Sequence, residues 1–235
     1  SRVPIGVGDD MAGVTVLGGG MILLTADMLL DGVHFDTATQ AIERIGHKAI
    51  ACSLSDCAAM AVVPTAALTS LALPRDWTEE QAERLMAAMA ATADRYDCPV
   101  VGGDITSWPG RLAIDVAIVA QPDGGRRPIL RSGARPGDAI YVTGRLGHSL
   151  GGRHLDFEPR VAEARAIAAA LGGKLHAMMD ISDGLSLDLW RMCEASGCGA
   201  LLDEQALLST ASEAAVLSAR PTLDQIGRAS CRERV

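Results

Sequence analysis

The chain has 235 residues and a formal net charge of −8, with 29 Asp and Glu residues against 21 Lys and Arg residues. This acidic balance argues against nucleic acid as a partner, because nucleic-acid binding needs a basic surface. No apolar run approaches the ~20 residues that span a bilayer, and no signal-peptide pattern opens the sequence. We therefore expect a cytoplasmic protein with no membrane partner, and its 49% hydrophobic residues are enough for a core.

The first half of the chain alternates predicted strands and helices. A capping box, Thr78-Glu79-Glu80-Gln81, marks one helix start, and Pro64 and Pro74 are predicted to stop elements. In chain order we expect a strand over 22–26 that ends at Asp27, a helix over 39–62, a strand over 66–73, a helix over 78–96, a strand through Val100 and Val101 that ends in a turn at Gly102-Gly103-Asp104, and a strand over 112–119.

The second half continues the mixture. The Pro- and Gly-containing stretch 121–127 is the best candidate for a lobe boundary, which predicts an N-terminal lobe over 1–125 and a C-terminal lobe over 126–225. We expect strands over 139–143, 177–179 and 200–202, and helices over 147–155, 160–171 and 186–195. Intermixed strands and helices indicate an α/β (α+β) fold class.

The last ten residues, 226–235, differ in character from the rest. They have no apolar periodicity and contain a cluster of Arg, and the string resembles what a common sequencing-library adaptor encodes when it is read in frame. We interpret this tail as non-native and exclude it from the fold.

Five short acidic motifs carry most of the chemical information. Nearly every one follows or interrupts an apolar run, where a carboxylate is costly without a positive partner. Converging carboxylates would bind a hard cation such as Mg²⁺, which usually implies nearby phosphates. Helix capping, ordinary turns and, for Asp56, a buried ion pair are the alternatives. The motifs are Gly8-Asp9-Asp10, Thr25-Ala26-Asp27, Leu54-Ser55-Asp56, Gly102-Gly103-Asp104 and Asp180-Ile181-Ser182-Asp183-Gly184.

Several common catalytic motifs are absent from the sequence. It has no phosphate-binding G-x-x-x-x-G-K-[ST], no protein-kinase motif set and no H-E-x-x-H. Any nucleotide chemistry must therefore depend on carboxylate-bound metal rather than on a lysine.

The motifs, taken in order and spacing, resemble the thiamine-monophosphate kinase family from about Ile5 to Leu207. The matching segments are Gly8-Asp9-Asp10, Asp31-Gly32-Val33-His34-Phe35, Ile45-Gly46-His47-Lys48-Ala49, Leu54-Ser55-Asp56-Cys57-Ala58-Ala59-Met60, Gly102-Gly103-Asp104-Ile105-Thr106, Arg131-Ser132-Gly133-Ala134-Arg135-Pro136-Gly137-Asp138, Val142-Thr143-Gly144-Arg145-Leu146-Gly147 and Asp180 to Leu185.

The resemblance implies the two-lobe fold of the aminoimidazole ribonucleotide synthetase superfamily. Its N-terminal lobe contributes strands to a β-barrel in a homodimer, and its C-terminal lobe is a layered α/β domain. The implied reaction moves the γ-phosphoryl group of ATP to thiamine monophosphate, with Mg²⁺ and a monovalent cation such as K⁺ as helpers.

The resemblance also implies roles for individual residues. His34 matches a substrate contact, and Gly103, Asp104, Arg131 and Ser182 match nucleotide contacts. Asp104, Arg131 and Asp183 match the catalytic positions, although Arg131 in a surface ion pair and His34 as a packed strand-end residue are alternatives. The implied metal ligands are Asp10, Thr25, Asp27, Asp56, Asp104, Asp180 and Asp183.

The sequence departs from the family pattern at several places. Ala26 replaces a hydroxyl residue, Ala61 replaces a Gly, and the family's later segment and C-terminal aromatic that hold thiamine have no counterpart here. We therefore expect this chain alone to phosphorylate thiamine monophosphate poorly. The alternatives are another ATP-using synthetase of the superfamily, a metal-dependent phosphohydrolase, or a non-catalytic fragment that binds Mg-nucleotide.

Overall fold

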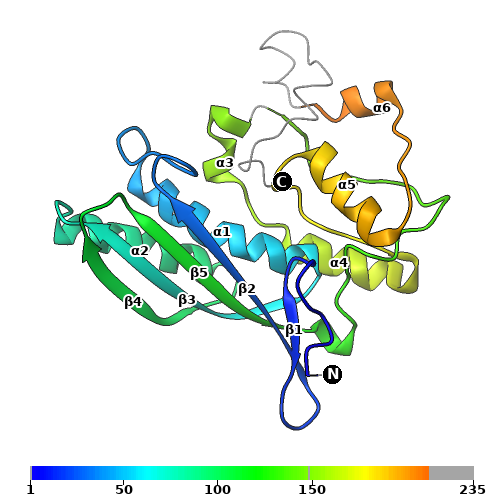
Figure 1. Cartoon of the computed structure of the whole chain (residues 1–235), viewed down its shortest axis with the longest axis horizontal. Coiled ribbons are helices and arrows are strands. Elements are labelled where there is room, and N and C mark those ends of the chain that lie inside the picture. The colour runs from blue at the N-terminus through cyan, green and yellow to red at the C-terminus, as the bar shows by residue number, and fades with distance from the viewer. Residues whose placement is uncertain (1, 148, 212–235) are drawn as a thin grey trace.

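A five-stranded sheet forms the centre of the first half of the chain in the computed structural model, which describes residues 2–147 and 149–211 (Figure 1). The strand order is β1-β2-β5-β3-β4; β3 and β4 are parallel and the other neighbours are antiparallel. The strands are β1 (Ala12–Thr15), β2 (Met21–Leu30), β3 (Val63–Pro74), β4 (Val100–Trp108) and β5 (Ala113–Gln121).

The two faces of the sheet have different environments. Along β5, Ile114, Val116 and Ile118 are fully buried, whereas the alternate residues are only partly buried. Because successive side chains of a strand point to opposite faces, this alternation marks one face covered by helices and one open face. Helices α1 (Ile42–Ala59) and α2 (Glu79–Asp94) lie on the covered face (Figure 1).

Helix α1 is buried on nearly all of its sides. The sheet and α2 pack on part of its surface, and α3 (Arg153–Asp156) and α4 (Val161–Leu171) from the second half pack on the rest. At Gly46, an added Cβ would lie 2.8 Å from the Ala88 Cβ and 2.9 Å from the Leu85 carbonyl oxygen. Gly46 weakens helix propensity, but it allows α1 and α2 to approach this closely.

The regular secondary structure in the second half of the described chain is helical, and long irregular segments connect the helices. Besides α3 and α4 it contains α5 (Leu185–Ser196), α6 (Glu204–Ser209) and short 3₁₀ turns at Ser149–Gly151 and Gly172–Lys174; a third turn, Asp123–Gly125, follows β5. The predicted helices over 160–171 and 186–195 are confirmed, and the one over 147–155 is shorter and broken. No helix within residues 2–147 and 149–211 is both long and apolar enough to span a membrane.

The strands predicted over 139–143, 177–179 and 200–202 are wrong for the described chain. A strand needs a continuous ladder to a neighbour, and here the backbone makes isolated contacts instead. Met178 N donates to the Leu130 carbonyl at 3.0 Å, and a single bridge joins Leu146 to Ala211.

Two strand ends also differ from prediction. β2 continues to Leu30, so Asp27 lies within the strand, and β4 continues to Trp108, so Gly102-Gly103-Asp104 lies in the strand instead of a turn. Both strands continue because they have partners over these residues: Asp27 is aligned with Val116, and Asp104 with Ser70. The predicted tail over 226–235 lies outside the described residues.

Ala61 ends α1 in a strained conformation. Its φ is +53°, and the Val62 N–H donates to the Cys57 carbonyl at 3.1 Å, as in a helix C-terminus that favours Gly. A Cβ in this left-handed region costs about 1 kcal/mol. The family's Gly at this position would avoid that cost.

We predict that Ala61→Gly stabilises the protein by about 0.5–1 kcal/mol, because Gly adopts φ > 0 without strain. Urea unfolding followed by circular dichroism measures the change. The control is Ala51→Gly in the interior of α1, which should destabilise by about 1 kcal/mol or more. Loss of stability in both variants would contradict the strain at Ala61.

Candidate metal and nucleotide site

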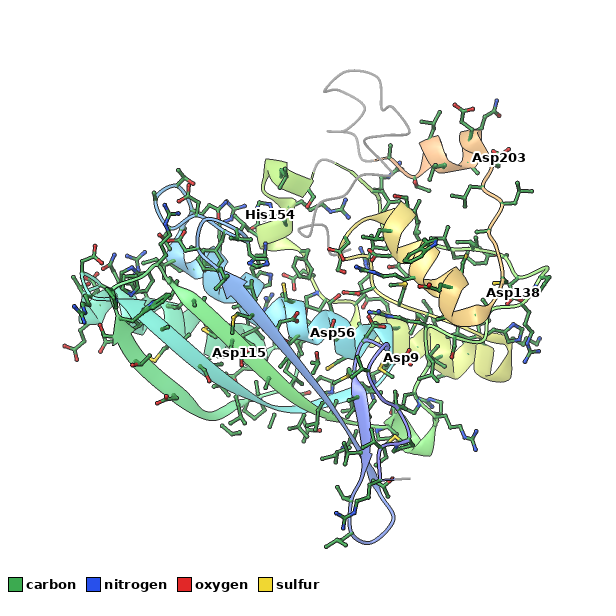
Figure 2. The ribbon with its side chains drawn as sticks, in the orientation of Figure 1. Asp9, Asp56, Asp115, Asp138, His154 and Asp203 are labelled. Atoms are coloured by element: carbon green, nitrogen blue, oxygen red, sulfur yellow. The ribbon has the colours of Figure 1, made fainter. Side chains whose placement is uncertain are left out.

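Three carboxylates from distant parts of the chain meet beside the C-terminal turn of α1. Asp10 precedes β1, Asp56 lies on α1, and Asp180 lies in the loop before α5. An oxygen of each lies within 4.8 Å of an oxygen of the other two. Figure 2 labels Asp56 on α1, between the sheet and the helices of the second half, and Asp9 at the neighbouring start of β1. We call Asp10, Asp56 and Asp180 the carboxylate trio.

Hydroxyl groups orient two members of the trio. Thr25, on the covered face of β2, donates to Asp56 Oδ2 at 2.5 Å, and Ser55 donates to Asp180 Oδ2 at 2.8 Å. Consecutive residues of α1 thus contact the sheet on one side and the second half on the other. Asp27, two residues after Thr25 on the same face, accepts from Ser53 at 3.1 Å.

Arg131 is the basic partner of Asp10. Its guanidinium donates to both Asp10 oxygens, from Nε at 3.2 Å and from Nη2 at 2.5 Å, and its backbone N–H donates to Asp9 Oδ1 at 2.7 Å. The Asp10 side chain is only 1% exposed. A bidentate Arg–carboxylate pair fixes geometry as well as charge, so Arg131 attaches the start of the second half to the loop before β1.

The environment of Asp10 disfavours its ionised form. Burial raises the pKa of the Asp10 carboxyl to about 7; the charge of Asp180 also raises it, whereas the Arg131 hydrogen bond opposes the rise. A cation among the trio would favour the ionised form of every member.

Asp188 of α5 fixes the backbone of the loop Asp180–Gly184. Asp188 Oδ2 accepts from the backbone N–H groups of Ser182, Asp183 and Gly184 at 2.8, 2.8 and 3.0 Å. The Asp188 side chain is 1% exposed, and burial raises the pKa of its carboxyl. The Asp183 side chain pairs with Arg191 at 2.5 Å. Asp183 is only three residues from Asp180 in the sequence, but its carboxylate is not a member of the trio.

Asp104 lies on the open face of the sheet. It is aligned with Ser70 on β3, which is aligned in turn with Asp115 on β5. Asp115 lies between the buried Ile114 and Val116, so this row faces away from α1. Gly103 is adjacent, with φ +154°, and an added Cβ would lie 1.7 Å from the Thr69 carbonyl oxygen, so only Gly fits there. Within one chain, Asp104 is separated from the trio by the sheet.

His34 lies in the turn after β2. Its Nδ1 accepts from the Leu30 N–H at 2.9 Å, and its carbonyl oxygen accepts from the buried Lys48 at 2.6 Å. His34 is not a member of the one group of possible metal ligands found in residues 2–147 and 149–211.

Comparison with known proteins gives matches over most of the chain. Two domain models match: AIR synthase related protein, N-terminal domain, over residues 8–121, and AIR synthase related protein, C-terminal domain, over residues 135–224. A thiamine-monophosphate kinase of Rhodopirellula baltica is 40% identical over 88% of this chain and 66% of its own length. One of Synechococcus elongatus is 34% identical over 87% of this chain and 69% of its own length. The chain belongs to the thiamine-monophosphate kinase family.

A solved member of this family shares the fold. AaThiL complexed with AMPPCP and TMP is 33% identical, with a TM-score of 0.72 over 81% of this chain and 65% of that one. The match confirms the predicted aminoimidazole ribonucleotide synthetase-like, mixed α/β fold class. The chain spans slightly less than two thirds of the Rhodopirellula kinase.

The structure adds residues that the family resemblance did not single out. Asp9 and Ser55 lie in two of the acidic motifs, next to the predicted ligands Asp10 and Asp56, and this adjacency could have indicated them. Asp188 and Arg191 gave a weaker one: two charged residues three apart in an otherwise apolar helix pattern, which is also typical of an exposed ion pair. Asp9, Ser53, Ser55, Asp188 and Arg191 all support predicted ligands.

We predict that Asp10→Asn alters how stability depends on pH. At Asp10 the folded protein holds a proton that the unfolded chain has lost, because the Asp10 pKa of about 7 exceeds the unfolded value of about 3.9. The contribution of Asp10 to stability therefore falls from pH ~4 to ~7 and no further above it. Relative to wild type, Asp10→Asn should gain about 1–2 kcal/mol between pH 5 and pH 7.

Urea unfolding in the presence of a chelator measures this difference. Asp123→Asn is the control, because the Arg165 hydrogen bond lowers the pKa of Asp123 and its titration lies below this range. Equal pH slopes for wild type and Asp10→Asn would contradict the assignment to Asp10.

Proposed function

We propose that the protein transfers the γ-phosphoryl group of ATP to thiamine monophosphate and forms thiamine diphosphate. The observation that carries the proposal is the carboxylate trio within 4.8 Å, with Arg131 on Asp10. The names of the relatives and the AMPPCP and TMP in the AaThiL complex support both substrates. AMPPCP is a non-hydrolysable ATP analogue.

The residues present fit Mg²⁺. The trio offers only oxygen ligands, from groups whose mutual repulsion a divalent cation relieves, and Mg²⁺ prefers such ligands beside phosphates. Asp10, Asp56 and Asp180 would hold it, with Thr25, Asp27 and Asp183 as nearby oxygen donors. When bound, Mg²⁺ supplies neutralisation of phosphate charge. A monovalent cation such as K⁺ would assist.

This chain's own residues would mainly position the substrates. Arg131 already lies on the trio and has the planar donors that suit phosphate oxygens. Ser182 and Asp183 lie in a loop whose backbone Asp188 fixes, and Ser182 would contact the nucleotide. The nucleophile is an ionised phosphate oxygen of thiamine monophosphate, so no general base is required; phosphoryl transfer depends on positioning and charge neutralisation.

The proposed homodimer explains how Asp104 and Gly103 could take part. Both lie on β4, an edge strand that is exposed over most of its length, and Asp104 faces the open side of the sheet. Apolar residues including Leu24, Met28 and Leu68 are exposed on that side. An exposed apolar sheet face next to a long free edge is typical of an association surface. We propose that a second copy covers it, and that Asp104 and His34 act in the dimer.

The proposed location is the cytoplasm, because an ATP-dependent biosynthetic reaction draws on the nucleotide pool there. Calorimetric titration with AMPPCP and an assay for thiamine diphosphate test the function together. Binding that depends on Mg²⁺, with thiamine diphosphate formed slowly from ATP and thiamine monophosphate by this chain, is the expected result. Phosphate release without the acceptor would indicate a phosphohydrolase, and binding without product a non-catalytic role for this chain.

We predict that Asp183→Asn lowers Mg²⁺-dependent thiamine diphosphate formation at least about 100-fold relative to the unsubstituted protein, because it removes a charged ligand of the proposed Mg²⁺. The fold should persist, because the Asp183 backbone N–H keeps its bond to Asp188. Product formation is measured by chromatography and folding by circular dichroism.

The matched control for that variant is Asp123→Asn. Asp123 is also paired with an Arg, and its side chain is 15% exposed against 18% for Asp183. The control should keep near-normal turnover. Unchanged turnover in Asp183→Asn would remove Asp183 from the site.

We predict that Leu68→Glu weakens the homodimer about 100-fold or more, because a charge would be buried in the covered sheet face without a partner. Leu171→Glu on α4 is the control: both leucines are 45% exposed, but Leu171 is not on the sheet. Sedimentation velocity over a concentration series measures association. A wild-type monomer at high concentration, or equal association of the two variants, would contradict the proposed interface.

A further inference from the structure

Arg191 on α5 holds two carboxylates through one nitrogen. Its Nη1 donates to Asp183 Oδ2 at 2.5 Å and to Asp188 Oδ1 at 2.9 Å. As Arg131 does at Asp10, Arg191 places a cationic group on an oxygen of a proposed metal ligand, here Asp183. A metal ion that takes this oxygen must compete with the guanidinium.

The two carboxylates have different surroundings. Asp188 is buried, at 1% exposed, and its other oxygen fixes the backbone of residues 182–184. Asp183 is 18% exposed and Arg191 is 35% exposed, so water and ions reach their contact. The Asp188 contact is therefore structural, whereas the Asp183 contact can exchange.

We propose that Arg191 is a positioning residue that competes with the site's cation for Asp183 and so sets the affinity of the site for divalent metal. The inference rests on the proposed function, in which Asp183 is a metal ligand. Arg191 holds the Asp183 carboxylate ready beside the site and yields it when a cation binds.

The exchange is feasible because Arg191 keeps a partner. When Asp183 turns to a cation, Arg191 retains its contact with Asp188, so the buried Asp188 is not left without its counter-charge, which would be strongly unfavourable. The loop backbone also stays in place, because its three N–H bonds go to the other Asp188 oxygen. Only the Asp183 side chain has to move.

The competing contact is partly exposed, and such ion pairs are of modest strength. Removing the competitor should therefore raise the metal affinity by a moderate factor. We expect Arg191→Gln to bind Mn²⁺ about three- to tenfold more tightly than wild type. Mn²⁺ is a suitable probe, because it accepts the same oxygen ligands as Mg²⁺ and the concentration of free Mn²⁺ is measured by electron paramagnetic resonance.

A double-mutant cycle separates this competition from the general effect of losing a positive charge. In the Asp183→Asn background, Arg191→Gln still removes the charge but no longer frees a ligand. The gain in Mn²⁺ affinity should then shrink to less than about twofold. Arg191→Met, which has no donor, should behave like Arg191→Gln in both backgrounds. In each variant the three backbone N–H bonds to Asp188 remain, and circular dichroism checks that the fold is kept.

Arg165→Gln is the matched control. Arg165 pairs with Asp123 at 2.9 Å, and the two side chains are 37% and 15% exposed, close to the values of the Arg191–Asp183 pair. This control should leave Mn²⁺ affinity unchanged.

The outcomes distinguish the inference from the proposed function. No Mn²⁺ binding by wild type would overturn the proposed metal site itself. Unaltered binding in Asp183→Asn would overturn Asp183 as a ligand. Normal wild-type binding that is unchanged or weaker in Arg191→Gln, or an equal gain in both backgrounds, would overturn the role of Arg191 alone.

Discussion

Repulsion between carboxylates that the fold forces together is the constraint on which the rest of the site depends. Asp10, Asp56 and Asp180 come from three separate segments, and burial raises the pKa of Asp10 to about 7. The arrangement persists because hydroxyls from Thr25 and Ser55 and the guanidinium of Arg131 offset part of the cost. The fold therefore maintains an unfavourable cluster that a divalent cation would relieve.

Much of the fold could be predicted from the sequence, because local signals and tertiary packing agree. The capping box at Thr78 begins α2, and the apolar period gives α4 and α5 at nearly their observed bounds. The predicted ends of β2 and β4 were wrong for a physical reason. Each strand extends as far as its partner strand does, and the sequence of one strand carries no information about the length of its partner. The strands predicted after residue 126 failed because those segments have no continuous partner in the described chain.

The candidate site divides in the same way. Acid residues next to apolar runs gave five candidate motifs, and three of these contain the members of the trio. Pattern alone could not show that Asp104 faces the opposite side of the sheet from Asp56. That depends on register, which the alignment of Asp104 with Ser70 and of Ser70 with Asp115 supplies. The role of Asp188 was hidden for another reason. Its bonds go to backbone N–H groups earlier in the chain, and these carry no residue identity.

Because α1 is buried, the part of the proposed site on this helix opens only when the core opens. Residues 48–59 are all shielded from solvent, and Ser53, Ser55 and Asp56 are among them. Amide hydrogens there should exchange with solvent only when the whole domain opens, whereas the loop before α5 can open locally. The free energy of opening at Asp56 should thus equal the free energy of unfolding of the whole domain. A substitution at Asp56 therefore puts the fold at risk together with the proposed metal site, whereas α5 buries only Leu185 and Asp188.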